Sequence, residues 1–149
     1  MLGTTNIVAF VAVADYDRSR DFYERILGLT FVKNDGFAMV MDANGIMVRF
    51  VKMPAVTPQQ FTVLGWQVSD IDRQVADLQA RGVRFERFGF FEQDTLGIWT
   101  APGGDKVAWF KDPDGNVLSV SQHVYVACML NQYRMRAVAA SLGCQLSLM

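Results

Sequence analysis

A chain of 149 residues, of which 51% are hydrophobic and 19% charged, is long enough for one well-buried domain and too short for two of average size. Its formal net charge of -1, without a run of lysine or arginine, excludes an extended basic surface for nucleic acid or an anionic membrane. The longest apolar run, residues 7–14, is far shorter than the roughly 20 residues that cross a bilayer.

The first half of the chain predicts a strand, a helix and three more strands. Residues 7–14 are apolar and rich in β-branched side chains, which is typical of a strand, and Asp15 can cap a helix that follows. Apolar residues recur at spacings of three and four through residues 22–27, and Gly28 supplies the left-handed residue that ends such a helix. The three further strands are expected at residues 30–33, 37–41 and 46–52.

The second half predicts the same elements in the same order. A strand is expected over residues 61–68, followed by a helix that begins after a cap at Asp70 and ends at Gly82. The three further strands of this half are expected at residues 84–90, 106–111 and 116–121.

An internal repeat relates the two halves. VADYDR at residues 13–18 recurs as VSDIDR at residues 68–73, and DANG at residues 42–45 recurs as DPDG at residues 112–115. In the DPDG turn, an aspartate at the first position, a proline at the second and a glycine at the fourth fit a type I turn followed by a left-handed glycine. Because the matches keep their order along the chain, they indicate a duplicated β-α-β-β-β unit.

Two segments carry a family resemblance: VADYDRSRDFYERILGL at residues 13–29 and AWFKDPDGNVLSV at residues 108–120. Together with the repeat, they resemble the vicinal oxygen chelate superfamily, which includes glyoxalases, bleomycin-resistance proteins and extradiol dioxygenases. The resemblance implies an α+β fold in which two pseudo-symmetric βαβββ modules form a curved mixed sheet around a cavity. We expect one domain over residues 1–149, with module one at 6–53, module two at 61–123 and a C-terminal extension at 124–149.

The superfamily's enzymes hold a divalent metal with one residue near the start of each module's first strand and one on each module's last strand, usually His, Glu or Gln. Carried over by spacing, these positions resemble Val8, Val63, Arg49 and Ser119. Valine has no donor atom, a neutral serine hydroxyl is a poor sole ligand, and a guanidinium repels a divalent cation. The residues therefore predict no metal and no cofactor.

The cavity lining is predicted from the alternation of side chains along strands. Residues two or four positions from a metal-ligand position should point to the same face of the sheet, and so into the cavity. The expected lining is apolar with a few polar groups, and suits an apolar or amphipathic ligand. Arg49 can orient an anionic group of such a ligand, pair with an internal acid such as Asp94 or Glu92, or point into solvent at a strand edge. The predicted ligand-binding residues are Val8, Phe10, Met39, Met47, Arg49, Val63, Gln67, Trp109 and Ser119.

Nucleophilic catalysis is not evident in the sequence. The single histidine, His123, follows Ser119 and Ser121 at alternating positions, without an evident acid to orient it. Asp105, Glu92 and Asp94 are expected in loops, where carboxylates are usually solvated. We therefore expect His123 to be a surface or interface histidine. The aromatic residues of the second half, Phe88, Phe90, Phe91 and Trp99, fit a core or an interface as well as they fit a ligand contact.

The ends of the chain bear on its location and partners. The N-terminus lacks the basic and apolar regions of a signal peptide, so we expect a cytoplasmic protein. Both cysteines, Cys128 and Cys144, lie near the C-terminus, which fits a reducing compartment and favours neither a disulfide framework nor a thiolate metal site. Residues 125–142 have the periodicity of a helix that ends at Gly143. Such a helix can cover a sheet, close the cavity or pack in a dimer; the alternative is a weakly ordered extension.

These observations favour a metal-free protein that binds a small molecule and sequesters it, as the bleomycin-resistance branch does. The alternatives are a glyoxalase-type lyase, isomerase or dioxygenase with a non-standard site, and an interaction module whose cavity is filled by its own side chains. The resemblance also implies a homodimer. We expect no nucleic-acid partner and no membrane partner.

Overall fold

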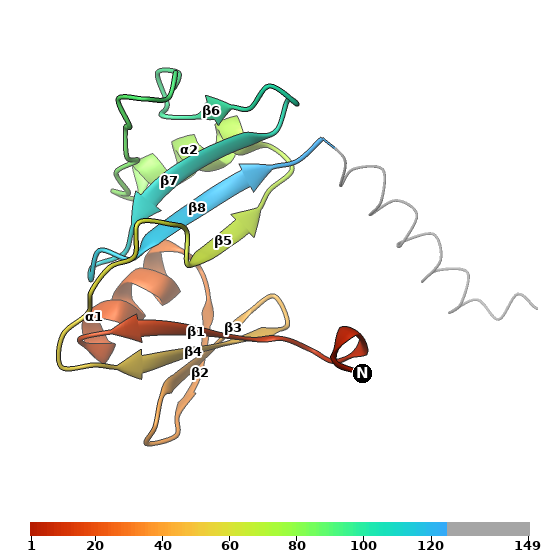
Figure 1. The fold of residues 1–149 in the computed structure, drawn as a ribbon. Coiled ribbons are helices and arrows are strands. Elements are labelled where there is room, and N and C mark those ends of the chain that lie inside the picture. Colours follow the sequence, from red (N-terminus) through yellow and green to blue (C-terminus); the bar gives the residue numbers. More distant parts are fainter. Residues whose placement is uncertain (125–149) are drawn as a thin grey trace, which may run out of the picture.

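The computed structural model describes residues 1–124, so the helix predicted over residues 125–142 lies outside the described residues (Figure 1). Two four-stranded sheets make up the described part, with strand orders β1-β4-β3-β2 and β5-β8-β7-β6. In each sheet the first strand of the module pairs with its last strand in parallel, and the other pairs are antiparallel. The predicted α+β fold of two βαβββ modules is therefore confirmed.

Module one begins after a short 3-10 turn, η1 (Leu2–Thr4). Its helix is capped by Asp15, whose side chain accepts a hydrogen bond from the Arg18 backbone N–H at 2.8 Å, as the sequence predicts. The helix widens into a π-helical segment before Gly28, which has a φ of 83°. Its elements are β1 (Val8–Val13), α1 (Tyr16–Arg20), η2 (Asp21–Ile26), β2 (Thr30–Asn34), β3 (Met39–Ala43) and β4 (Ile46–Lys52).

Module two repeats these features. Asp70 caps its helix by accepting a hydrogen bond from the Arg73 backbone N–H at 3.1 Å, and Gly82 follows the helix with a φ of 90°. Helix α2 packs on β7 and β8, so one face of the second sheet lies in the core and the other faces away from the helix. The elements are β5 (Leu64–Gln67), α2 (Ile71–Ala80), β6 (Trp99–Thr100), β7 (Lys106–Lys111) and β8 (Val117–Gln122).

The strand predicted over residues 84–90 is wrong. Only an isolated bridge between Phe85 and Phe110 forms there, and the strand beside β7 is instead β6 at Trp99–Thr100. The Gln93 side-chain amide binds the Phe88 N–H and the carbonyls of Glu86 and Gly97 at 2.7 to 3.0 Å. Because a side chain satisfies these backbone groups, the segment forms a compact loop in place of a longer strand.

The DPDGN turn at residues 112–116 joins the two modules. Its Asp112 carboxylate accepts a hydrogen bond from the buried Tyr23 hydroxyl at 2.9 Å, and the Asn116 amide donates to the Ala12 carbonyl at 2.8 Å. Asp114 forms an ion pair with Arg18 and accepts a hydrogen bond from the Ala14 backbone N–H at 3.1 Å. A turn that the sequence identifies as a hairpin therefore also fixes module two onto the end of β1.

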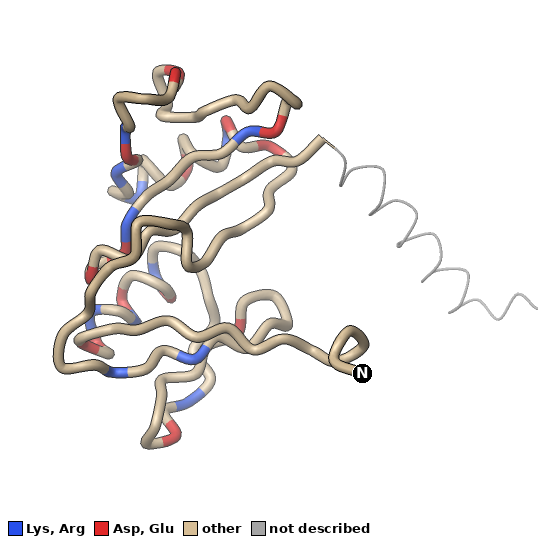
Figure 2. Tube along the Cα trace, viewed as in Figure 1, with Lys and Arg blue, Asp and Glu red and all other residues tan. Residues whose placement is uncertain are grey.

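One hydrophobic core contains buried residues of both modules, among them Val13, Phe50, Ile71 and Phe110. Figure 2 shows the charged residues of both signs spread over helices, hairpins and loops, whereas β1, β5 and β8 carry none. No helix of the described residues combines the length and the apolar character needed to cross a membrane.

Candidate functional site

The face of the second sheet that points away from α2 carries the polar and aromatic side chains of its central strands. Phe110, Leu118 and Val120 point into the core, so Trp109 and Ser119 point to the opposite face. Trp109 pairs with Ser119 across β7 and β8. Part of this face forms the floor of a pocket.

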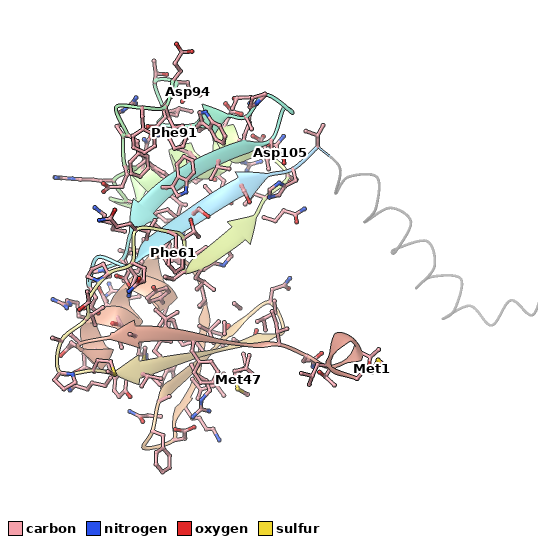
Figure 3. The ribbon with its side chains drawn as sticks, in the orientation of Figure 1. Met1, Met47, Phe61, Phe91, Asp94 and Asp105 are labelled. Carbon is pink, nitrogen blue, oxygen red and sulfur yellow. The ribbon has the colours of Figure 1, made fainter. Side chains whose placement is uncertain are left out.

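That pocket has a volume of about 700 Å³. Its floor is formed by Trp109, Lys111 and Val117, and its walls by two loops at residues 58–62 and 88–91. Figure 3 shows Phe61 beside the linker that leads into β5, and Phe91 in the loop beyond β7. The volume is in the range typical of small-molecule sites.

An aromatic cluster forms one wall of the pocket. The Phe91 ring stacks on Trp109 with a centroid distance of 5.5 Å and an interplanar angle of 5°, and it also lies 4.8 Å from Trp99. Phe88 meets Trp109 edge to face at 5.5 Å. Phe90, which packs on Phe91 at 4.6 Å, is 78% exposed. The packed rings hold Trp109 and Phe91 in fixed positions, while Phe90 presents an open ring to the pocket.

Two polar groups adjoin these rings. Lys111 lines the pocket and its ammonium lies 3.2 Å from the Glu86 carboxylate, with the lysine side chain 48% exposed. Ser119 is only 7% exposed, and its hydroxyl makes no hydrogen bond to another described residue. Gly65 lies across from it on β5, where a Cβ atom would come within 2.8 Å of the Ser119 Oγ. The glycine therefore leaves room for the serine hydroxyl.

The predicted site residues of module one lie on a different surface. Val8 pairs with Met47 and Phe10 with Arg49 across β1 and β4, on the face opposite the core. Val8, Phe10 and Met47 are 44%, 63% and 43% exposed. Val8, Phe10, Met47 and Arg49 do not line the pocket of module two, whereas Trp109 does.

Arg49 pairs with an internal acid, which is one of the predicted alternatives, but the acid is Asp35 and not Asp94 or Glu92. The Arg49 guanidinium donates to the Asp35 carboxylate at 2.7 Å. Backbone N–H groups of Ala38 and Phe37, and then Arg49, lower the pKa of Asp35 to about 2. The charge of Arg49 is thus largely compensated within the protein.

Met39 was predicted on the cavity face and lies in the core, where it is 2% exposed. The prediction equates Met39 with Trp109 through the repeat, but the two hairpins differ in register by one residue. In the first, Ala43 pairs with Ile46 around a two-residue turn whose Asn44 and Gly45 both have positive φ. In the second, Lys111 pairs with Val117 around five residues. A shift of one residue moves a side chain to the other face of the sheet.

The positions that resemble the metal ligands are structurally equivalent in the two modules. Arg49 lies two residues beyond Met47, the partner of Val8, and Ser119 lies two residues beyond Val117, whose carbonyl accepts the Val63 N–H. The donors at these positions do not fit a divalent metal. Among residues 1–124, no group of three or more His, Cys, Asp or Glu side chains is arranged to hold a metal ion.

A cluster of three polar side chains, Asp105, His123 and Ser121, lies at the end of β8. This cluster is not predicted from the sequence. His123 Nδ1 is 3.0 Å from the Asp105 carboxylate, and its Nε2 is 3.0 Å from the Ser121 hydroxyl. Asp105 is therefore an acid that orients His123, although no such acid is evident in the sequence. Hydrogen bonds from His123 and from the Val124 N–H hold the pKa of Asp105 below its usual value. Gln67, another predicted site residue, is exposed and pairs with Ser121 across β5 and β8.

Comparisons with known structures support the same fold. The bleomycin resistance determinant encoded on transposon Tn5 has a TM-score of 0.64 and 22% identity, with 81% of this chain and 99% of that chain covered. A superfamily member from Sphaerobacter thermophilus has a TM-score of 0.64 and 23% identity, with 80% and 98% covered. Lactoylglutathione lyase from Agrobacterium tumefaciens has a TM-score of 0.62 and 18% identity, with 80% and 93% covered.

At these identities the structural similarity shows the fold and no more. A search among curated proteins found no significant match. The sequence model of one family matches residues 5–120, close to the span of residues 6–123 over which the family resemblance is predicted. The chain therefore belongs to the Glyoxalase/Bleomycin resistance protein/Dioxygenase superfamily.

Proposed function

We propose that the protein binds a small aromatic or amphipathic molecule by non-covalent contacts in the pocket of module two, without a metal ion. The observation that carries this proposal is the open pocket of about 700 Å³ beside a packed cluster of aromatic rings. Stacking on Phe91 and Phe90 would fix the plane of an aromatic ligand. The ligand's polar groups would find the Lys111 ammonium at the pocket, and Ser119 lies next to Trp109 on the neighbouring strand.

Sequestration is the mode of action that these features favour. The pocket offers apolar contacts and one cation, while the positions equivalent to the superfamily's metal ligands lack suitable donors. The Tn5 bleomycin resistance determinant shares the fold. We propose that this chain also acts by binding and holding a small molecule, whose identity the pocket does not specify. We further propose a cytoplasmic homodimer, in which a second copy covers the exposed Val8, Phe10 and Met47.

Titration with 8-anilinonaphthalene-1-sulfonate, a planar aromatic sulfonate, tests the binding proposal by fluorescence and calorimetry. We expect saturable binding of one molecule per chain. Phe91→Ala and Trp109→Ala each remove a large aromatic contact and should weaken binding about 10- to 100-fold. The matched control is Phe37→Ala, which removes a phenylalanine that is 84% exposed and does not line the pocket. Equal weakening by the control, or binding that does not saturate, would contradict the proposal.

Lys111→Met separates charge recognition from stacking. It should weaken binding of the sulfonate several-fold, because the ammonium at the pocket is lost. Binding of the neutral analogue N-phenyl-1-naphthylamine should not weaken. If the neutral and anionic probes lose affinity equally, Lys111 acts only through the shape of the pocket.

A further inference from the structure

Three side chains at the end of β8 form a linear hydrogen-bonded chain of acid, imidazole and hydroxyl. Asp105 Oδ2 lies 3.0 Å from His123 Nδ1, and His123 Nε2 lies 3.0 Å from Ser121 Oγ. Asp105 precedes β7, whereas Ser121 and His123 belong to the end of β8 and the residues after it. The antiparallel pairing of these strands therefore brings the three residues together. Figure 3 shows Asp105 at this end of the second sheet.

The order of the groups fixes the direction of the hydrogen bonds. The Asp105 carboxylate can only accept a bond, so it favours the tautomer of His123 that carries its proton on Nδ1. The lone pair of Nε2 is then free to accept the Ser121 hydroxyl proton. Asp105 is itself held by the Val124 backbone N–H at 2.9 Å. An imidazole oriented by an acid and in contact with a hydroxyl is the arrangement that activates a serine nucleophile.

The group is accessible to small molecules. The side chains of His123 and Asp105 are 37% and 39% exposed, and Ser121 is half-buried. Ser121 and Ser119 have the same parity on β8, so their side chains lie on the same face of the sheet, about 7 Å apart along the strand. Ser119 faces Trp109 across the strand pair. Ser121 therefore lies on the same face of the sheet as Trp109, an aromatic side chain that the aryl group of a substrate can contact.

We propose that Ser121 is a nucleophile toward small aryl esters, with His123 as its general base and Asp105 as the positioning residue. Ser121 Oγ bonds to the ester carbonyl carbon, the bond from that carbon to the aryl oxygen breaks, and the hydroxyl proton passes through His123 Nε2 to the departing aryl oxide. Water then attacks the acyl-serine, its proton returning through His123 to Ser121, and releases the carboxylic acid. The amide of Gln67, which pairs with Ser121 across β5 and β8, would donate an N–H to the carbonyl oxygen.

This proposal does not depend on ligand binding in the aromatic pocket, because the reactivity of Ser121 can be measured with a reagent too small to need the pocket. Diisopropyl fluorophosphate is such a reagent. Serine attack at phosphorus displaces fluoride and leaves a stable adduct that peptide mass spectrometry locates. We expect one adduct per chain, on Ser121, and slow hydrolysis of 4-nitrophenyl acetate by the unlabelled protein.

Four variants and one control variant make the test specific. Ser121→Ala should abolish the adduct, and His123→Gln should slow its formation at least 100-fold. Asp105→Asn should slow it because the preferred tautomer of His123 is lost, and Asp105→Glu should restore part of the rate. Ser69→Ala, at an exposed serine that has no hydrogen bond to a histidine, is the control and should react as the original chain does.

An adduct that forms equally in Ser121→Ala, or no adduct at all in the folded protein, would overturn the proposal. Circular dichroism and thermal unfolding of each variant establish that it is folded. An unchanged rate in Asp105→Asn would assign Asp105 a purely structural role and would equally refute the relay. Binding of 8-anilinonaphthalene-1-sulfonate measured on the same samples reports separately on the proposed function.

Discussion

Replacing Tyr23 with phenylalanine removes one hydroxyl from the joint between the two modules. Tyr23 is fully buried and Asp112 is 5% exposed, and the hydrogen bond between them is 2.9 Å long. Burial, reinforced by the Asp112 carboxylate, raises the pKa of Tyr23 far above its usual value, so the hydroxyl keeps its proton and donates. The substitution leaves the ring in place and deletes only this donor.

The expected cost follows from the partners that Asp112 retains. A hydrogen bond to a charged group contributes about 1.5–3 kcal/mol, and an unpaired buried acceptor adds a desolvation penalty. The same carboxylate oxygen, however, also accepts a bond from the Asn116 amide at 2.8 Å, and its other oxygen accepts two backbone N–H bonds. Asp112 is thus not orphaned, and we expect a loss of about 2 kcal/mol in the free energy of unfolding.

Urea unfolding followed by circular dichroism and fluorescence measures this loss. A chain of this size should also lose about 4–8 °C in Tm. Tyr16→Phe is the matched control: its hydroxyl accepts a 3.3 Å bond from the exposed Lys52 N–H, so its loss should cost less than 1 kcal/mol. A cost below about 0.5 kcal/mol for Tyr23→Phe, or one equal to the control, would refute the reasoning that the turn joins the modules.

Three further predictions concern other sites. Because the pKa of Asp35 is lowered to about 2, its ionised carboxylate stabilises the fold above its ordinary pKa of about 4. This stabilisation is lost as the pH falls from about 4 toward about 2. Acid unfolding of Asp35→Asn should therefore lack the loss of stability in this pH range. Gly65→Ala should destabilise the fold by about 1 kcal/mol, and less when combined with Ser119→Ala, because the second change removes the Oγ that lies 2.8 Å from the new Cβ. Phe10→Asp should convert the proposed dimer to monomer in light scattering without lowering Tm by more than a few degrees, since Phe10 is 63% exposed.

The duplicated fold could be predicted because local signals agreed with it at each step. Asp15 and Asp70 cap the helices, Gly28 and Gly82 follow them, and the turn glycine Gly115 has a φ of 86°. These are properties of single residues and their near neighbours, which a sequence states directly. The failure at residues 84–90 has a different cause, because the Gln93 amide binds the backbone across several residues, and propensity does not register such contacts.

The candidate site was predicted less well because it depends on register and on distant contacts. Equating DANG with DPDG was correct as a repeat, yet the two turns differ by one residue in hairpin register, and this moved Met39 into the core. The predicted partners of Arg49, Asp94 and Glu92, belong to module two, whereas its partner in the structure is Asp35, 14 residues upstream in the turn between β2 and β3. The contact between Asp105 and His123 depends on the register of β7 and β8. That register pairs Lys106 with Gln122, and so brings the start of β7 to the end of β8.

The two modules diverge in the segments that surround their equivalent strand faces. In module one, Arg49 is compensated by Asp35 and the neighbouring apolar side chains are exposed on the strand face. In module two, the longer segment between α2 and β6 brings Phe88, Phe90 and Phe91 over the equivalent face, and the linker at residues 58–62 closes the other side. The walls of the module-two pocket are therefore connecting segments added to a strand order that both modules share.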